Sequence, residues 1–289
     1  MIKSDCHMHT CFSADSEATV ISMLDAAVEK GLEGVCITDH MDLDFPETPD
    51  FPANAFQFDL DEYFGQLNRL KEQYKGKLDL RIGVEIGLQK HLGEAYHRLT
   101  EAYPFDFVIG SVHLVGGQDP YYRKIFEGRT DEEVYRMAFR EILENVEAVK
   151  DFDALGHLDY VVRYGIHQAA EYSYRKFSDE IDAVLKKLIA EGKGLEMNLA
   201  GIKYGLGFPN PHPDVLKRYR ELGGEIITIG ADAHEPAHVA YEFEKATEIL
   251  RECGFSYYAE FHGRKPVFQR IVPYNCISME LVLEFLFLF

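Results

Sequence analysis

Two kinds of segment alternate along this chain. Short apolar runs rich in β-branched residues are followed by longer segments in which apolar residues recur at helical spacing. This alternation is typical of β-α units that build a parallel sheet. Seven strands are predicted, at residues 2–7, 34–40, 80–86, 105–113, 154–158, 194–199 and 225–232. Helices are predicted at residues 20–28, 60–74, 131–149, 178–190, 213–222 and 236–253, with Gly31 ending the first.

The series of units is not divided by a linker. The 289 residues suit one barrel-sized domain or two small ones, but no composition break, Gly/Ser-rich stretch or internal repeat separates them. A single α/β domain is therefore expected. The longest irregular insert, residues 41–58, follows the second strand and is rich in proline and acid. In a closed β/α barrel it would overhang the carboxyl ends of the strands, which makes it a candidate lid.

Residue types that bind metal ions stand at the ends of six of the seven predicted strands. In chain order these residues are His7, His9, His40, Glu85, His113, His157, Asp232 and His234. The carboxyl ends of parallel strands meet at one mouth, so these side chains are expected to share one pocket. A single strand-end histidine is usually an ordinary structural residue, but chance poorly explains the whole set.

Spacing within the set also favours a metal site. His7 and His9 are two residues apart, so on an extended strand they point to the same side, and the same holds for Asp232 and His234. Imidazole and carboxylate together suit zinc, manganese or iron, and so many ligands imply two or three ions, with Glu85 as the natural bridge. Asp15 could add a ligand, or it could cap the helix that starts near residues 16 to 19.

Charge and cysteine content limit the partners and the compartment. The chain has 30 lysines and arginines against 49 aspartates and glutamates, a formal net charge of −19, which disfavours nucleic acid as a partner. Five cysteines without a CxxC pair argue against a disulfide framework and fit the cytoplasm. No secretory signal or membrane span is expected. The apolar segment 278–289 is expected to dock on the body or on another subunit, which leaves a homo-oligomer open.

The motifs at these positions resemble those of the polymerase and histidinol phosphatase (PHP) superfamily, in its histidinol-phosphate phosphatase branch. They are Asp5-Cys6-His7-Met8-His9-Thr10 with Ser13 and Asp15, Ile37-Thr38-Asp39-His40, Gly83-Val84-Glu85, Gly110-Ser111-Val112-His113, Gly156-His157-Leu158-Asp159, Gly230-Ala231-Asp232-Ala233-His234 and Gly263-Arg264-Lys265-Pro266. The resemblance implies a distorted (β/α)7 TIM-like barrel over residues 1–272 with a trinuclear centre. Residues 273–289 match nothing known in the family and form a separate tail.

Carried over position by position, the resemblance implies three ion sites. His7, His9, Glu85 and Asp232 would hold the first ion, Glu85, His113 and His157 the second, and Asp15, His40 and His234 the third. Some relatives have histidine in place of Asp15, and the harder oxygen ligand could change the preferred metal. The implied activity is hydrolysis of L-histidinol phosphate to L-histidinol and phosphate in histidine biosynthesis.

Several residues are expected to assist a phosphate ester in such a site. Clustered divalent ions would neutralise the dianion and lower the pKa of bound water. Arg163 could grip phosphate oxygens or form a surface salt bridge, and Asn198 could orient the substrate or turn the chain. Arg264 and Lys265 are weaker phosphate candidates, and Asp42 and Glu47 in the insert could bind the substrate amine. Either His234 or Asp232 could protonate the leaving oxygen, and the sequence does not decide this.

Three other functions remain open at this stage. Relatives of the same scaffold cut other small phosphate esters or nucleic acid, although the net charge of −19 argues against the latter. A non-catalytic metal-binding protein is less consistent with a complete ligand set. Amidohydrolase barrels also begin with His-x-His, but they use a lysine bridge where this chain has Glu85.

Overall fold

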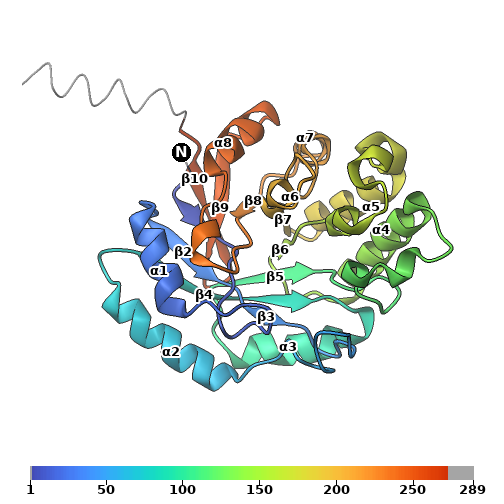
Figure 1. The fold of residues 1–289 in the computed structure, drawn as a ribbon. Coiled ribbons are helices and arrows are strands. Elements are labelled where there is room, and N and C mark those ends of the chain that lie inside the picture. The colour runs from blue at the N-terminus through green and yellow to red at the C-terminus, as the bar shows by residue number, and fades with distance from the viewer. Residues whose placement is uncertain (1, 273–289) are drawn as a thin grey trace, which may run out of the picture.

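Seven parallel strands form the centre of the computed structural model, which describes residues 2–272 (Figure 1). Each strand pairs with the next one in the sheet order β1-β2-β4-β5-β6-β7-β8. Their bounds are β1 Ser4–Asp5, β2 Gly34–Ile37, β4 Asp79–Gly87, β5 Phe107–Ser111, β6 Ala154–Leu155, β7 Gly194–Asn198 and β8 Ile227–Gly230. All seven predicted strands are therefore present, most of them shorter than predicted. A further short strand, β3 (His40–Met41), pairs with β4.

The first and last strands of this sheet are joined by hydrogen bonds, so the sheet is nearly closed. The backbone N–H of Cys6 donates to the carbonyl of Ile229 at 2.9 Å, and that of His9 donates to the carbonyl of Ala233 at 2.8 Å. The return bond runs from Asp232 N–H to the carbonyl of His7 at 2.9 Å. This closure confirms the expected distorted (β/α)7 barrel in a single domain, and it brings the first and seventh strand ends together.

Helices surround the strands on the outside of the barrel (Figure 1). Their bounds are α1 Val20–Glu29, α2 Leu60–Gln73, α3 Gly93–Ala102, α4 Asp131–Ala148, α5 Ser178–Ala190, α7 Pro213–Glu221 and α8 Phe243–Glu252, with a short α6 at Ala200–Lys203. The cap residues set where helices begin. The hydroxyl of Thr19 accepts from Ser22 N–H at the start of α1, and Thr130 and Glu133 form a capping box at the start of α4. The first helix ends before Gly31, whose φ of +72° is the left-handed conformation expected there.

Two helix predictions need correction. The helix α3 was not predicted, because Tyr96 is its only buried residue and the segment therefore lacks an apolar repeat. The predicted helix 236–253 begins only at Phe243. Residues 236–238 form a separate 3-10 turn, and the positive φ of Glu242 (57°) separates that turn from α8.

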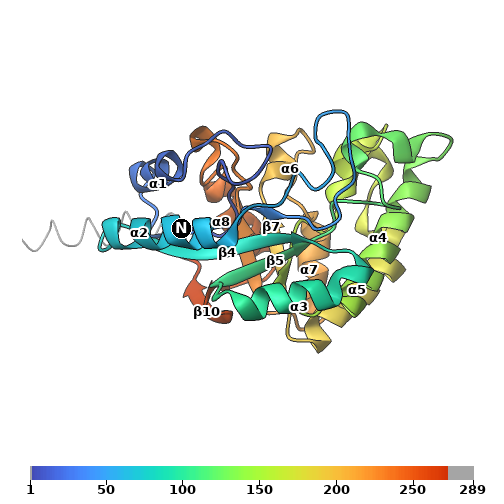
Figure 2. The same ribbon diagram turned by 90° about the horizontal axis from the view of Figure 1, so that it is seen from below.

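An antiparallel hairpin of β9 (Tyr257–His262) and β10 (Lys265–Arg270) was also not predicted. In Figure 2, β10 lies on the opposite side of the strands from α6. Arg264, in the hairpin turn, bonds with its side chain to Asp153 and with its backbone N–H to the carbonyl of Asp106. Those two aspartates precede β6 and β5, so the turn lies at the amino ends of the strands. The prediction that Arg264 binds substrate is therefore wrong. The same holds for Lys265, which follows Arg264 directly at this end of the barrel.

The insert 41–58 folds against the carboxyl ends of the strands. Phe45 and Phe56 pack with Leu114 in a small apolar cluster, and two backbone bonds cross the loop, from Asp42 N–H to Phe56 and from Asn54 N–H to Phe45. This is the position expected of a lid, and its opening stays a prediction. Within residues 2–272, no helix is both long and apolar enough to cross a membrane. The expectation for segment 278–289 lies outside the described residues.

Candidate metal centre

The two histidines after β1 face each other inside the mouth of the barrel. Their Nε2 atoms are 3.0 Å apart, and both side chains are fully buried. Oδ1 of Asp232, which follows β8, lies 3.3 Å from Nε2 of His9. Two imidazole nitrogens and a carboxylate oxygen thus point at one small volume, as expected for His7, His9 and Asp232.

Glu85, on β4, lies at the centre of the cluster. Its Oε1 is 2.9 Å from Nε2 of His157 and 3.3 Å from Nε2 of His113. Its Oε2 is 2.9 Å from Nδ1 of His40 and 3.3 Å from Nε2 of His7. One buried carboxylate therefore reaches histidines from four parts of the barrel, which is the placement expected of a bridging ligand.

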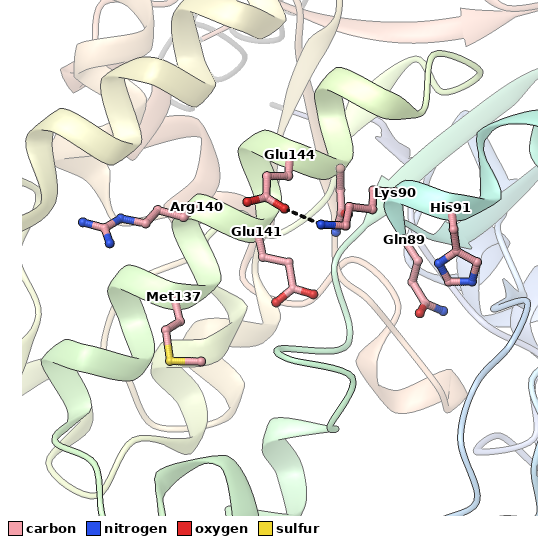
Figure 3. A pocket seen from close by; sticks show the side chains of 8 residues that line it. Gln89, Lys90, His91, Met137, Arg140, Glu141 and Glu144 are labelled. Carbon is pink, nitrogen blue, oxygen red and sulfur yellow. Dashed lines mark hydrogen bonds and ion pairs between the residues drawn. The ribbon is translucent and has the colours of Figure 1, made fainter.

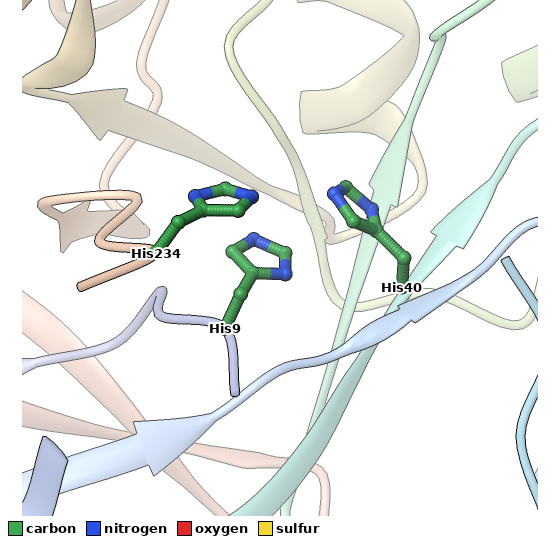
Figure 4. A group of neighbouring side chains, drawn as sticks. All are labelled: His9, His40 and His234. Atoms are coloured by element: carbon green, nitrogen blue, oxygen red, sulfur yellow. The ribbon is translucent and has the colours of Figure 1, made fainter. Parts of the chain in front are cut away.

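The third group of residues lies on the outer side of this cluster. The ring of His9 stacks between those of His234 and His40, with centroid distances of 4.1 and 4.2 Å (Figure 4). Asp15 Oδ2 lies 3.2 Å from Nε2 of His234 and 3.6 Å from Nε2 of His40. Because Thr19 caps α1, Asp15 is free to face the histidines, and the alternative of a capping role is wrong.

The donor atoms fit metal ions rather than a closed network of hydrogen bonds. Nδ1 of His40 and Oε2 of Glu85 are both buried, and neither has a hydrogen-bond partner among residues 2–272, although they are only 2.9 Å apart. Groups of donors lie within 4.8 Å of one another in four combinations: His9, His40 and His234; His7, His9 and Glu85; His40, Asp42 and His113; and Glu85, His113 and His157. Nitrogen and oxygen donors in such groups suit zinc, manganese or iron.

Opposite charges within the cluster offset the cost of burial. Burial by itself would raise the pKa of Glu85, but neighbouring imidazoles, those of His7 and His113 foremost, hold it well below its usual range. Burial would likewise raise the pKa of Asp232, but neighbouring imidazoles, that of His7 foremost, hold it well below its usual range. Burial and two neighbouring imidazoles lower the pKa of His9 well below its usual value, which favours the neutral form that binds metal.

Side chains behind the cluster orient its histidines. Nδ1 of His7 donates to Oε1 of Glu196 at 2.6 Å, and Nδ1 of His113 is 2.7 Å from Oδ2 of Asp42. Such contacts fix which ring nitrogen faces a metal. Sequence reasoning missed Glu196, although it precedes Asn198 by two residues on β7 and alternation would have placed both on one face. Asp42 thus orients a histidine through one oxygen, and its predicted contact with a substrate amine stays a prediction.

Arg163 and Asn198 lie beside the cluster, as predicted. Arg163 is 5% exposed, so the alternative of a surface salt bridge is wrong. Its Nε donates to Asn210 at 2.8 Å and one terminal nitrogen donates to Asn198 Oδ1 at 3.2 Å, while the other lies 3.7 Å from Asp232 Oδ2. Asn198 also donates to Oδ2 of Asp232 at 3.2 Å. The two amides hold the guanidinium at the edge of the cluster.

A cavity of about 850 Å³ opens above these residues. It is lined by Asp15, His40, Asp42, Phe45, Asp50, Phe51, Phe56, His113, Asp119, Tyr121, Tyr122, Arg123, His157, Tyr160, Arg163, Tyr164, Tyr204, Asp232 and His234. Glu47 is exposed and does not line the cavity, so its predicted contact with substrate is not supported. A second pocket, of about 420 Å³, contains the Lys90–Glu144 ion pair and none of the nine predicted metal ligands (Figure 3).

Comparison with known proteins places the chain in a family. A family model described as PHP domain matches residues 5–200. The chain belongs to the PHP domain family. The "Probable histidinol-phosphatase" of Clostridium acetobutylicum is 33% identical over 93% of this chain and 98% of its own length. The histidinol-phosphatase of Lactococcus lactis is also 33% identical, over 92% of this PHP protein and 96% of its own length.

One solved structure resembles the PHP barrel closely. It is histidinol phosphate phosphatase from Lactococcus lactis in complex with zinc, L-histidinol and phosphate, at 31% identity and a TM-score of 0.84. The match covers 92% of this chain and 98% of that one. The histidinol-phosphatase branch that the motifs indicated is therefore confirmed.

Proposed function

We propose that this PHP protein is a metal-dependent phosphatase that hydrolyses L-histidinol phosphate to L-histidinol and inorganic phosphate. The observation that carries the proposal is the convergence of the nine predicted metal ligands in one cluster, six of which line the same cavity as Arg163. A relative that shares most of the chain binds zinc together with both products of this reaction. A net charge of −19 requires local cations to attract a phosphate dianion, and such a cluster supplies them.

Two to three divalent ions, zinc, manganese or iron, fit the donor set. His7, His9, Glu85 and Asp232 would hold the first, Glu85, His113 and His157 the second, and Asp15, His40 and His234 the third. When bound, these ions supply charge neutralisation and a nucleophile at neutral pH. A protein of this type belongs to histidine biosynthesis and to the cytoplasm.

The other polar side chains at the cavity would bind the phosphate group or position the residues that do. Arg163 is held by two amides and presents N–H groups toward Asp232, where it would grip phosphate oxygens. Asn198 positions Arg163 and Asp232 together. His234 is part-exposed at the cavity, and as a ligand of the third ion it would act through that ion instead of donating a proton itself. Glu85 and Asp232 would act through the ions that they hold.

The alternative is a PHP phosphoesterase with another substrate, either a different small ester or nucleic acid. Steady-state rates on L-histidinol phosphate, an aryl phosphate and single-stranded DNA distinguish the three. We expect kcat/KM for L-histidinol phosphate to exceed that for the aryl phosphate by about 100-fold or more, because the binding energy of the histidinol moiety is added to that of the phosphate. Comparable rates on all three would reject the assignment.

Size measurement of the whole chain tests the predicted homo-oligomer.

A further inference from the structure

The cavity is lined by more carboxylates than the metal cluster needs. They are Asp15, Asp42, Asp50, Asp119 and Asp232. Two of them, Asp15 and Asp232, face the clustered histidines. Asp42 is held by His113, and Asp50 accepts a hydrogen bond from the hydroxyl of Tyr122 at 2.9 Å. Asp119 differs from the other four, because within residues 2–272 no side chain forms a hydrogen bond or ion pair with its carboxylate.

The local backbone holds Asp119 in place. It precedes the short 3-10 helix Pro120–Tyr122, and its Oδ1 accepts from the backbone N–H of Tyr121 at 2.9 Å. The second oxygen is left for a ligand. Burial raises the pKa of Asp119, the hydrogen bond from Tyr121 N–H and the attraction of His113 partly offset this rise, and the charges of Asp42 and Asp15 add to it.

Aromatic side chains connect the cluster with the position of Asp119. The ring of Tyr160 lies 4.9 Å from that of His157 and 5.1 Å from that of Tyr164, and the ring of Tyr121 lies 6.0 Å from Tyr164. These centroid distances describe a continuous aromatic wall. A wall of this kind suits a flat ring, and the guanidinium of Arg163 already lies over the ring of Tyr160, 5.1 Å from its centroid.

We propose that Asp119 binds the primary ammonium group of the substrate, while Tyr121, Tyr160 and Tyr164 line the space for its imidazole ring. The inference rests on the proposed phosphatase function and names the residue that selects an amino alcohol phosphate. With phosphate at the cluster beside Arg163, the cationic part of the ligand would need its countercharge elsewhere. Asp119 is the cavity carboxylate that no side chain of residues 2–272 holds, so it is available to provide this charge.

The test is Asp119→Asn, which keeps the acceptor for the Tyr121 N–H and removes the charge. With the metal-loaded whole chain, we expect KM for L-histidinol phosphate to rise about tenfold to a hundredfold, the range for loss of a charged hydrogen bond. The value of kcat should change much less. Kinetics on p-nitrophenyl phosphate, which has no ammonium group, should stay the same, as should metal content. Glu127→Gln is the matched control, because Glu127 is an exposed carboxylate eight residues further along the same loop that does not line the cavity, and this change should leave the kinetics on both substrates unaffected.

Equal losses on both phosphate esters, or an unchanged KM for L-histidinol phosphate, would overturn the role of Asp119 while leaving the phosphatase assignment in place. Calorimetric titration with L-histidinol separates the two claims. If the native protein binds L-histidinol and the Asp119→Asn variant binds it at least tenfold more weakly, the subsite is supported even where no ester is hydrolysed. A native protein with neither binding nor hydrolysis would reject both.

Discussion

At the scale of single residues, the metal centre depends on contacts behind its ligands as much as on the ligands. His7 shows this clearly. Its Nε2 faces His9 and Glu85, while its Nδ1 is fixed by Glu196 at 2.6 Å. The second oxygen of Glu196 accepts from the backbone N–H of His157, so one buried carboxylate supports two of the predicted ligands.

Replacing Glu196 therefore weakens metal binding without removing a ligand. In Glu196→Gln, the amide no longer attracts the His7 proton as strongly, and Nε2 becomes a weaker and less well oriented donor. We expect metal affinity to fall about 10- to 100-fold, the usual effect of such partners. Competition with a chelator of known affinity measures this directly. Glu248→Gln, an exposed change on α8, is the control and should not alter affinity. A Glu196→Gln variant with native affinity would contradict the positioning role.

At the scale of elements, the loop 41–58 lines part of the cavity and is expected to control access to it. Phe56 anchors it: the side chain is 7% exposed, and its ring lies 4.7 Å from Phe45, 4.9 Å from Phe51 and 5.4 Å from His40. These contacts belong to a small cluster separate from the main core. The loop is thus expected to open more readily than the barrel does.

Truncation of this anchor should loosen the loop before the barrel. In Phe56→Ala we expect up to about 3 kcal/mol less local stability, below the full cost of a core cavity because the cluster is small. Hydrogen exchange of the Asp42 and Asn54 amides, whose hydrogen bonds cross the loop, measures this loss of local stability. KM should rise as well. Phe268→Ala, on exposed β10, is the control and should change neither. Unchanged exchange in Phe56→Ala would show that other contacts hold the loop.

An ion pair joins α5 to α7 on the outside of the barrel. Arg218 donates to both carboxylate oxygens of Asp182, at 3.0 and 2.7 Å, and the pair lowers the pKa of Asp182 from 3.8 to about 2. A lowered carboxyl pKa stabilises the fold above the unfolded value and loses that effect as the pH falls from about 4 to about 2. After allowance for solvent, Asp182→Asn should cost about 1 kcal/mol at pH 7.

The difference in unfolding free energy between the native protein and Asp182→Asn should be smaller at pH 2.5 than at pH 7, because pH 2.5 lies close to the folded-state pKa of about 2. Urea unfolding of both proteins at pH 7 and at pH 2.5 measures this difference. A difference that is the same at both pH values would mean that packing, and not charge, holds the two helices together at this point.

The sequence predicted some elements better than others. The strands were found because short apolar runs rich in β-branched residues mark them, and the nine expected ligands do lie together. The helix α3 was missed because it buries only Tyr96, and the β9–β10 hairpin because β10 is exposed along most of its length. Arg264 was assigned to the wrong end of the barrel, because no local sequence pattern shows which end a hairpin covers.

Side chains that act from one strand to another were the hardest to predict. Glu196 and Asp119 have no motif of their own, and their roles depend on which histidine or cavity lies opposite in space. Asp42 was assigned to the substrate because its loop is acidic, whereas the fold turns it inward onto His113. Closure of the barrel decides these contacts, and a linear pattern does not contain that information.

At the scale of the whole molecule, the barrel gathers histidines and carboxylates from the ends of six of its seven strands into a buried cluster. The cavity above this cluster is lined by an arginine, by aromatic rings and by Asp119, a carboxylate with no side-chain partner among residues 2–272. An acidic protein is then expected to bind a phosphate ester through the ions that this cluster would hold, together with Arg163.

Phosphate release from L-histidinol phosphate during stepwise metal removal tests this claim most directly. The protein should contain two to three zinc, manganese or iron ions per chain, as elemental analysis of the same samples will show. Activity should fall at least 1,000-fold on complete chelation, an order of magnitude set by loss of metal-ion catalysis, and return when zinc or manganese is added. A chelated, metal-free protein that releases phosphate at the full rate would contradict the account.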